Sequence, residues 1–287
     1  MAKNSMMGRY ASGKAKDFAV KAAFDEDGNP TETFEKVVFR TLDVQRPLVL
    51  KNIQRIRENH PGETPEQLAQ RLSDQYVNTV TGAGAAVGGT AIIPGIGTVA
   101  ALGLSAAATV GFLEATALYA QSLAELHGIT TQDPERSKAL VMAVMLGEDA
   151  KELLGELAQR SGGRGPGDPS TGLTAMLGTG SGAGMGAMVV EQLKKRFIKR
   201  LLVRQGAGFV GRAVPFGIGA VIGGVGNRAM AKAVVQNARE LFGPLPTVLP
   251  EEIASVPVEG GRSRGGLLSG VLKALPGGRK DEDAPSA

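Results

Sequence analysis

The stretch YVNTVTGAGAAVGGTAIIPGIGTVAALGLSAAATVGFL, residues 76–113, contains no charged side chain. Pro94-Gly95 stands near its middle, where a proline removes a backbone N–H and its ring clashes with the preceding helical turn. We therefore predict two apolar helices that fold back on each other as a hairpin. Each arm has about 17 residues, or about 26 Å at 1.5 Å rise per residue. The hydrocarbon core of a bilayer is about 30 Å thick, so each arm nearly matches it.

Glycines recur along both arms, and Gly84 and Gly88 form a G-x-x-x-G spacing that lets helix backbones approach closely in lipid. Glycine costs about 1 kcal/mol against alanine inside a helix, so this number of glycines needs a reason. Two interpretations stay open, a membrane-seeking hairpin and a buried hairpin in an all-α core. The residues predicted to form turns and close packing are Gly84, Gly88, Pro94, Gly95, Gly103, Pro215, Gly219, Gly223 and Gly224.

Hydropathy limits how deeply such arms would insert. Each Leu, Ile, Val or Phe favours insertion by only about 0.3–0.6 kcal/mol at the centre of a helix. The first arm has few such residues, and threonines and glycines oppose them. The sequence therefore predicts insertion that is shallow, conditional or dependent on partner helices.

Composition excludes several function classes. The 287-residue chain has no cysteine, which excludes disulfides, thiolate metal sites and cysteine nucleophiles. Its start lacks the apolar run of a secretory signal, so we predict no signal peptide. The formal net charge of +4 suits anionic lipid or nucleic acid only weakly. Because the basic residues lack interleaved aromatics for base stacking, no specific nucleic-acid partner is predicted.

The predicted fold class is all-α, a helical bundle organised around Gly/Ala-rich apolar hairpins. We expect a flexible basic lead at 1–30 and amphipathic covering helices at 31–64. A helical core follows at 65–243, interrupted by a Gly/Ser/Pro-rich linker at 161–172. Residues 244–287 are rich in proline and glycine and are predicted to be a disordered tail.

Local signals mark where several helices begin and end. Thr31 is a predicted N-cap, and Thr64 with Gln67 has the pattern of a capping box. Asp133 caps a predicted helix that continues to about residue 154, apolar in its first half and charged in its second. Gly128 ends the second hairpin arm.

A basic amphipathic helix is predicted over EQLKKRFIKRLLVR, residues 191–204. Apolar side chains occupy about one half of the helical wheel and basic side chains the other half. Such a helix is attracted to an anionic membrane surface, although an ordinary surface helix with a solvated basic face is the alternative. The predicted anionic-surface contacts are Lys194, Lys195, Arg196, Lys199 and Arg200.

Four features together resemble the EcsC family, over roughly residues 65–243. They are the Gly-rich hairpin with its central proline, LYAQSLAELHG at 118–128 followed by Asp133-Pro134, LGEDAKELL at 146–154, and PFGIGAVIGG at 215–224. The third is similar to the family's L-G-D-x-A-K-E-x-L and the fourth to its P-x-x-G-x-x-I-G-G. The resemblance implies a bacterial, helical, membrane-associated protein linked with an ABC transporter system. It carries over no catalytic residue.

The best candidate polar site is the acidic cluster of Glu148, Asp149, Lys151 and Glu152. Close carboxylates can hold a raised pKa and perform acid–base chemistry. Alternatively, these groups form ion pairs with Arg228 or Arg212 and lock the fold. The chain lacks an H-E-x-x-H motif, a nucleophile elbow and a Walker loop, so no catalytic residue, metal or cofactor is assigned.

The sequence favours a non-enzymatic, membrane-associated protein with an accessory or scaffolding role in membrane homeostasis or beside a transporter. Two alternatives stay open, a pore-forming or membrane-perturbing protein and a soluble enzyme that uses the cluster near Glu148. The predicted partners are an anionic membrane surface and a membrane protein such as an ABC transporter, and an oligomer is left open. The expected location is the cytoplasmic face of the bacterial inner membrane.

Overall fold

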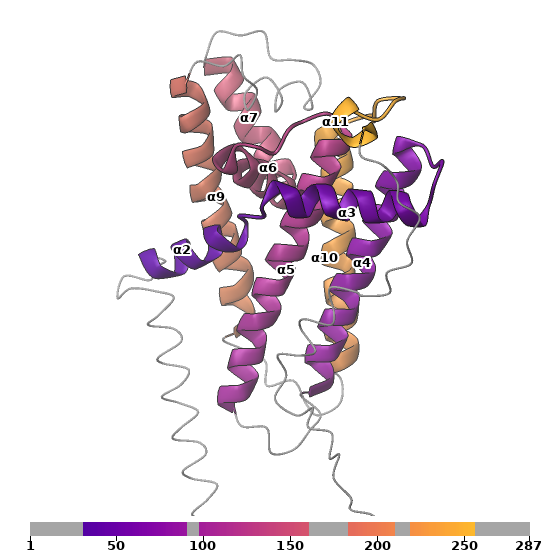
Figure 1. Ribbon diagram of the computed structural model, residues 1–287. Coiled ribbons are helices and arrows are strands. Elements are labelled where there is room, and N and C mark those ends of the chain that lie inside the picture. Colours follow the sequence, from indigo (N-terminus) through magenta and orange to yellow (C-terminus); the bar gives the residue numbers. More distant parts are fainter. Residues whose placement is uncertain (1–30, 91–97, 161–182, 210–218, 256–287) are drawn as a thin grey trace, which may run out of the picture.

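The computed structural model describes residues 31–90, 98–160, 183–209 and 219–255, and every regular element among them is a helix (Figure 1). The predicted all-α class is therefore confirmed. In chain order the helices are α2 (Glu32–Thr41), α3 (Arg46–Asn59), α4 (Pro65–Thr90), α5 (Thr98–Leu126), α6 (Pro134–Leu146), α7 (Glu148–Arg160), α9 (Ala183–Phe209), α10 (Gly219–Phe242) and α11 (Glu251–Ala254). The predicted lead, the Pro94-Gly95 turn and the 161–172 linker lie outside the described residues.

Side-chain caps set the helix starts that the sequence predicts. Thr31 Oγ1 accepts the N–H of Phe34 at 3.2 Å, and Asp133 accepts two N–H groups of the first turn of α6. The N–H of Gln67 donates to Thr64 Oγ1 at 3.3 Å, and the N–H of Thr64 donates to Gln67 Oε1 at 2.8 Å. These bonds satisfy N–H groups that a first helical turn leaves unpaired, so the predicted caps are confirmed.

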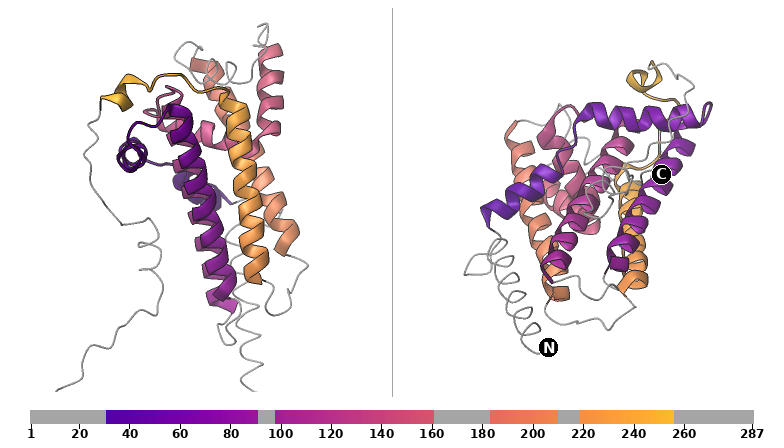
Figure 2. Two further views of the ribbon diagram at one scale, coloured as in Figure 1. Left: turned by 90° about the vertical axis from the view of Figure 1, so that its right-hand side faces the viewer. Right: turned by 60° about the horizontal axis from the view of Figure 1, so that its bottom comes forward.

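The helices α4 and α10 run antiparallel and pack along most of their length (Figure 2). At one point of close approach, a Cβ on Gly84 would lie 2.2 Å from Asn227 Nδ2. The Asn227 amide donates to the carbonyl of Val80 at 3.4 Å. Gly84 therefore lets α4 approach a helix that begins in the second Gly-rich stretch.

The helix α5 runs antiparallel to α4 and contacts it through a polar and aromatic layer. The rings of Tyr76 and Tyr119 stack with centroids 4.7 Å apart. Tyr76 Oη lies 2.8 Å from Thr116 Oγ1, and Tyr119 Oη lies 3.1 Å from Ser73 Oγ. Burial raises the pKa of both tyrosines, so they stay protonated as hydrogen-bonding partners. The turn that would join the two helices lies outside the described residues, so organisation around a Gly-rich hairpin stays a prediction.

The helix α6 is buried between α5, α9 and α10 and ends abruptly at Gly147. Gly147 has φ +61° and ψ −120°, a backbone conformation that suits glycine and strains residues with a Cβ. Asn237 of α10 donates to the carbonyl of Val144 at 3.0 Å beside this break. The sequence predicted one helix to about residue 154, which is wrong, since α7 starts as a separate helix at Glu148.

The short helices α2, α3 and α11 lie on the outside of the bundle, and α3 lies across α4 and α5 (Figure 1). Ile253 of α11 is buried, and its carbonyl accepts a hydrogen bond from Arg57 of α3. The prediction that the disordered tail starts at residue 244 is therefore wrong for 244–255. The Ile253 side chain and its backbone carbonyl hold this segment against α3. Residues 256–287 lie outside the described residues.

A buried ion pair ties α3 to α5 beneath α11. Glu125 is 4% exposed, and its carboxylate accepts from Arg46 Nε at 2.8 Å and from Arg46 Nη2 at 3.1 Å. The backbone N–H and hydroxyl of Thr131 donate to the same carboxylate at 2.8 and 2.7 Å. Burial alone would raise the pKa of Glu125, but the hydrogen bonds from Arg46 and Thr131 outweigh it and hold the pKa below its ordinary value.

The uncharged parts of three long helices lie at the same end of the bundle, at the bottom of Figure 1. They are the last turns of α4 (77–90), the first turns of α5 (98–113) and the first turns of α10 (219–227). The antiparallel order of the helices brings these segments together. The helices α4, α5 and α10 are thus polarised, with their uncharged segments together at one end and α3 and α11 nearer the other end.

Candidate functional site

The acidic cluster lies at the start of α7, directly after the Gly147 break. Lys151 Nζ donates to Glu148 at 2.7 Å and to Glu240 of α10 at 2.6 Å. These hydrogen bonds to Glu148 and Glu240 raise the pKa of Lys151, and the bond from Lys151 lowers the pKa of Glu240. The lysine therefore bridges two carboxylates from different helices.

The other carboxylates of the cluster face the basic helix α9, which lies beside α7 in Figure 1. Arg200 pairs with Asp149 and also donates to the carbonyl of Leu146 at 2.9 Å. Arg196 lies 3.9 Å from Glu152 and donates to the carbonyl of Asp149 at 3.2 Å. The predicted pairing with Arg228 is wrong, because Arg228 projects from α10 toward α4, and Arg212 lies outside the described residues.

The predicted anionic-surface residues are thus divided between internal contacts and solvent. Arg196 and Arg200 hold α9 to α7, and Lys194 donates to Glu135 of α6 at 2.9 Å. Lys195 lies 3.7 Å from Glu191 on its own helix, and Lys199 is exposed. Contact of this helix with an anionic surface stays a prediction, carried mainly by Lys195 and Lys199.

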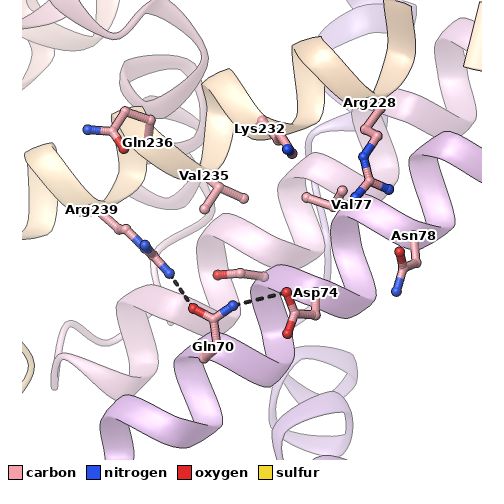
Figure 3. Close-up of a pocket in the computed structure, with 10 residues that line it drawn as sticks. Gln70, Asp74, Val77, Asn78, Arg228, Lys232, Val235, Gln236 and Arg239 are labelled. Atoms are coloured by element: carbon pink, nitrogen blue, oxygen red, sulfur yellow. Dashed lines mark hydrogen bonds between the residues drawn. The ribbon is translucent and has the colours of Figure 1, made fainter. Parts of the chain in front are cut away.

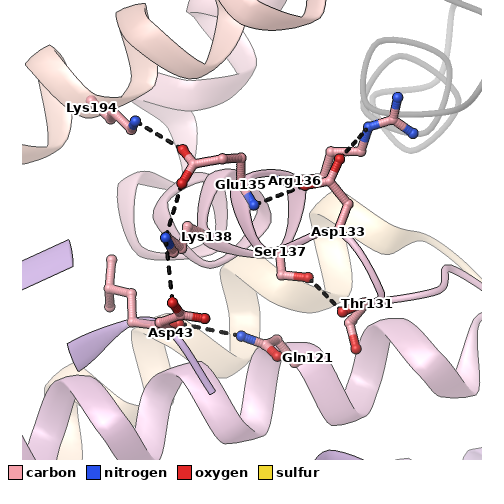
Figure 4. A network of polar contacts seen from close by, with 10 residues as sticks. Asp43, Gln121, Thr131, Asp133, Glu135, Arg136, Ser137, Lys138 and Lys194 are labelled. Carbon is pink, nitrogen blue, oxygen red and sulfur yellow. Dashed lines mark hydrogen bonds and ion pairs between the residues drawn. The ribbon is translucent and has the colours of Figure 1, made fainter. Parts of the chain in front are cut away.

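Lys194 belongs to a polar network at the start of α6, shown in Figure 4. Glu135 accepts from both Lys138 and Lys194 at 2.9 Å, and these two hydrogen bonds lower the pKa of Glu135. Lys138 also lies 3.5 Å from Asp43, between α2 and α3. The network joins α6 to α9 and to the α2–α3 connection, so its role is to hold these helices together.

The structure describes the surroundings of some of the predicted turn and packing residues and not of others. Gly84 contacts α10 as described above. For the glycines at 88, 103, 219, 223 and 224, the helix backbone is described but not the surroundings. Pro94, Gly95 and Pro215 lie outside the described residues.

The structure brings together a polar groove between α4 and α10 that the sequence did not predict (Figure 3). Its volume is about 330 Å³. The lining residues are Gln70, Ser73, Asp74, Val77, Asn78, Arg228, Lys232, Val235, Gln236 and Arg239. From here on these ten residues are called the α4–α10 groove.

Charge is distributed unevenly along the groove. At one end Arg239 donates to Gln70 Oε1, and Gln70 Nε2 donates to Asp74 Oδ1 at 3.0 Å, so these groups satisfy one another. At the other end, Arg228 and Lys232 have no carboxylate within ion-pair distance in the described part of the chain. Figure 3 shows Arg228 close to Asn78, with Lys232 between Arg228 and the Arg239 end.

The sequence did contain a signal for the groove. Arg228, Lys232 and Arg239 are spaced by four and seven residues, which places them on one face of a helix. That spacing alone does not tell whether the face meets carboxylates, solvent or another helix. The packing of α10 on α4 decides it here.

Among the described ranges, no group of three or more His, Asp or Glu side chains is arranged to hold a metal ion. Within the same residues, no helix combines the length and apolarity needed to cross a membrane.

The fold and the groove define the class of protein, an all-α bundle with an uncharged end and a basic groove between its two most closely packed helices. No family model, no curated protein and no solved structure matches the chain. The resemblance to the EcsC family accordingly stays a prediction from the quoted motifs.

Proposed function

We propose that this protein is a non-enzymatic, membrane-associated helical protein whose uncharged bundle end enters one leaflet of an anionic membrane. The observation that carries the proposal is the gathering of the uncharged parts of α4, α5 and α10 at one end. A soluble bundle has no evident need to keep charge away from one end over three helices. A lipid leaflet supplies a reason, because charged side chains in hydrocarbon cost several kcal/mol each.

The dimensions of the uncharged end fit a single leaflet. Residues 77–90 of α4 extend about 21 Å at 1.5 Å per residue. One leaflet has about 15 Å of hydrocarbon and about 20–22 Å in total with its headgroup region. The end would therefore reach the middle of the bilayer while the charged part of the bundle stays in water.

One described side chain near the uncharged end already faces outward. Val225 of α10 is 64% exposed, and a Cβ added at the neighbouring Gly226 would meet no atom within 4 Å. Valine in this position has apolar surface to bury on contact with lipid. It also gives a position where a substitution would leave the core untouched.

The contacts of the acidic cluster support an accessory role more than acid–base catalysis. Arg196 and Arg200 of α9 contact its carboxylates, and its own Lys151 contacts Glu240 of α10, so these contacts join α7 to α9 and α10. A scaffolding task beside a transporter or another membrane protein, as the motif resemblance implies, belongs to the same proposal.

Substitution of the exposed valine tests the proposal. Val225→Asp should weaken binding to vesicles of phosphatidylcholine with one quarter phosphatidylglycerol by about ten-fold or more, because aspartate strongly disfavours apolar surroundings. Flotation of the full-length protein with these vesicles measures the bound fraction. Val248→Asp is the matched control, since Val248 is 73% exposed near α11 at the other end and gains the same charge.

Wild type that stays unbound at every lipid concentration would refute the membrane proposal. Equal loss in Val225→Asp and Val248→Asp would show that charge repulsion, not insertion of this end, governs binding. Leakage of vesicle contents at the concentrations that give binding would instead favour the membrane-perturbing alternative.

A further inference from the structure

We propose that the α4–α10 groove binds a phosphate group, which Arg228, Lys232 and Asn78 contact directly. In the membrane-bound protein this phosphate belongs to a lipid headgroup, a part of the inference that rests on the proposed function. The proposal goes beyond membrane association because it names the chemical group and the residues that recognise it.

The donors at one end of the groove are available for a ligand. Among the described residues, Arg228 and Lys232 have no ion-pair partner and the Asn78 amide has no hydrogen-bonding partner. Arginine presents a planar fork of N–H donors that fits phosphate oxygens, and lysine adds a compact positive charge. Figure 3 shows these three side chains on facing helices at the same end of the groove.

The charge balance of the groove favours an anion. Three cationic side chains line it against one carboxylate, that of Asp74. The Asp74 carboxylate already accepts from Gln70, which in turn accepts from Arg239, so this carboxylate lies in the satisfied end. A phosphate placed between Arg228 and Lys232 therefore meets two cations before it meets Asp74.

The size and lining of the groove suit an esterified phosphate. A volume of about 330 Å³ leaves room for a phosphate together with the small group attached to it. Val77 and Val235 are half-buried and add apolar lining between the polar residues. A ligand with a charged head and an apolar continuation fits this combination better than an extended acidic peptide does.

The position of the groove along the bundle matches the level of lipid phosphates. Val77 and Asn78 begin the uncharged part of α4, and Arg228 directly follows the uncharged start of α10. When the uncharged end reaches the middle of a bilayer, Val77 and Asn78 lie about 18–20 Å from it along α4, and the backbone of Arg228 lies about 14 Å from it along α10. The headgroup layer of one leaflet extends from about 15 to about 22 Å from the midplane, where Asn78 lies and where the long side chain of Arg228 can place its guanidinium.

A double variant tests the groove. The pair R228Q/K232Q removes both cations while keeping polar side chains at these positions. The matched control is R40Q/K51Q, which removes two exposed cations from α2 and α3 that lie outside the groove. Thermal unfolding of each full-length variant checks that both pairs fold like wild type.

Two arms of the experiment distinguish the sources of phosphate. In the first arm, inorganic phosphate is titrated into each protein at constant ionic strength, with chloride as reference, and binding is followed by calorimetry. In the second arm, flotation is measured with phosphatidylcholine vesicles that contain one quarter phosphatidylglycerol. We expect vesicle affinity to fall about 30-fold in R228Q/K232Q, since each cation near an anionic surface contributes roughly five-fold. The control pair should change by less than about three-fold.

Each outcome decides the proposal. Loss of vesicle affinity in R228Q/K232Q alone supports the groove with a lipid headgroup as its ligand. Loss of inorganic phosphate binding in R228Q/K232Q, with vesicle affinity unchanged, supports the groove with a free phosphate as its ligand. If neither arm separates the groove pair from the control pair, the groove is not a phosphate site.

The arms also separate the groove from the proposed function. Wild type that binds no vesicles but binds inorganic phosphate through the groove would refute membrane association and leave the groove standing. The opposite result is vesicle binding that depends on Val225 and not on Arg228 and Lys232, together with no phosphate binding in the first arm. That result would support membrane association and refute the groove as a phosphate site.

Discussion

Arg46→Met is expected to destabilise the protein by about 3 kcal/mol at neutral pH. Removing the guanidinium leaves the Glu125 carboxylate buried without its cation, and breaking a buried pair from one side costs about 3–5 kcal/mol. Arg46 keeps some solvent contact, at 18% exposure of its side chain, so the lower end of that range applies. The variant also loses the contact of Arg46 with Glu252 of α11. Urea unfolding followed by circular dichroism at pH 7 measures the change.

Two further variants show whether the buried charge is the cause. Arg40→Met changes an exposed arginine in α2 and should alter the free energy of unfolding by less than about 0.5 kcal/mol. In R46M/E125Q the neutral amide oxygen can still accept from Thr131, so at least half of the lost stability should return. A double variant as unstable as Arg46→Met would contradict this account.

The stability difference between wild type and Arg46→Met should shrink as the pH falls from 7 to 4. The pKa of Glu125 is lowered in the folded protein, so its contribution is full above the ordinary carboxyl pKa of about 4.3 and is lost as the pH falls through the folded value. Without Arg46, burial raises the pKa of Glu125. As the pH falls, Glu125 is therefore protonated in the variant at a higher pH than in wild type, and the cost of its buried charge disappears from the variant first. Urea midpoints of both proteins at pH 7, 5 and 4 test this prediction. A stability difference that stays constant over this range would argue against it.

Gly147→Ala is expected to destabilise the protein by about 3 kcal/mol. A residue with a Cβ at φ +61° and ψ −120° is strained by about 1–3 kcal/mol. The new Cβ would also lie 2.5 Å from Asn237 Nδ2, so the Asn237 side chain must move. Its hydrogen bond to the Val144 carbonyl would then be lost, at about 1 kcal/mol. The change is measured by urea unfolding as for Arg46→Met.

A glycine in an ordinary helical position is the matched control for this substitution. Gly155 lies in α7 with no atom within 4 Å of an added Cβ, so Gly155→Ala should stabilise by about 0.5–1 kcal/mol. In G147A/N237A the clash is absent but the backbone strain persists, which separates the two causes. A neutral or stabilising Gly147→Ala would mean that α6 and α7 can join into one helix, as the sequence suggested.

Local sequence determined where several helices begin. The caps at Thr31, Thr64 and Asp133 depend on groups within three positions of each residue, so the sequence was enough to predict them. The all-α class followed from helical periodicity in the same way. Gly128, with φ +77°, lies just past the end of α5 for an equally local reason.

Tertiary structure decided which charges meet and where the candidate site lies. Asp149 pairs with Arg200, and Arg228 instead lines the groove with Asn78, because helix rotation and crossing set these neighbours. The sequence likewise did not predict the helix break at Gly147, because glycine also occurs within helices. The contact that distinguishes this position comes from Asn237 on α10. Caps act within one turn of chain, whereas ion pairs and grooves join residues that only packing brings together, so sequence alone determined the first and not the second.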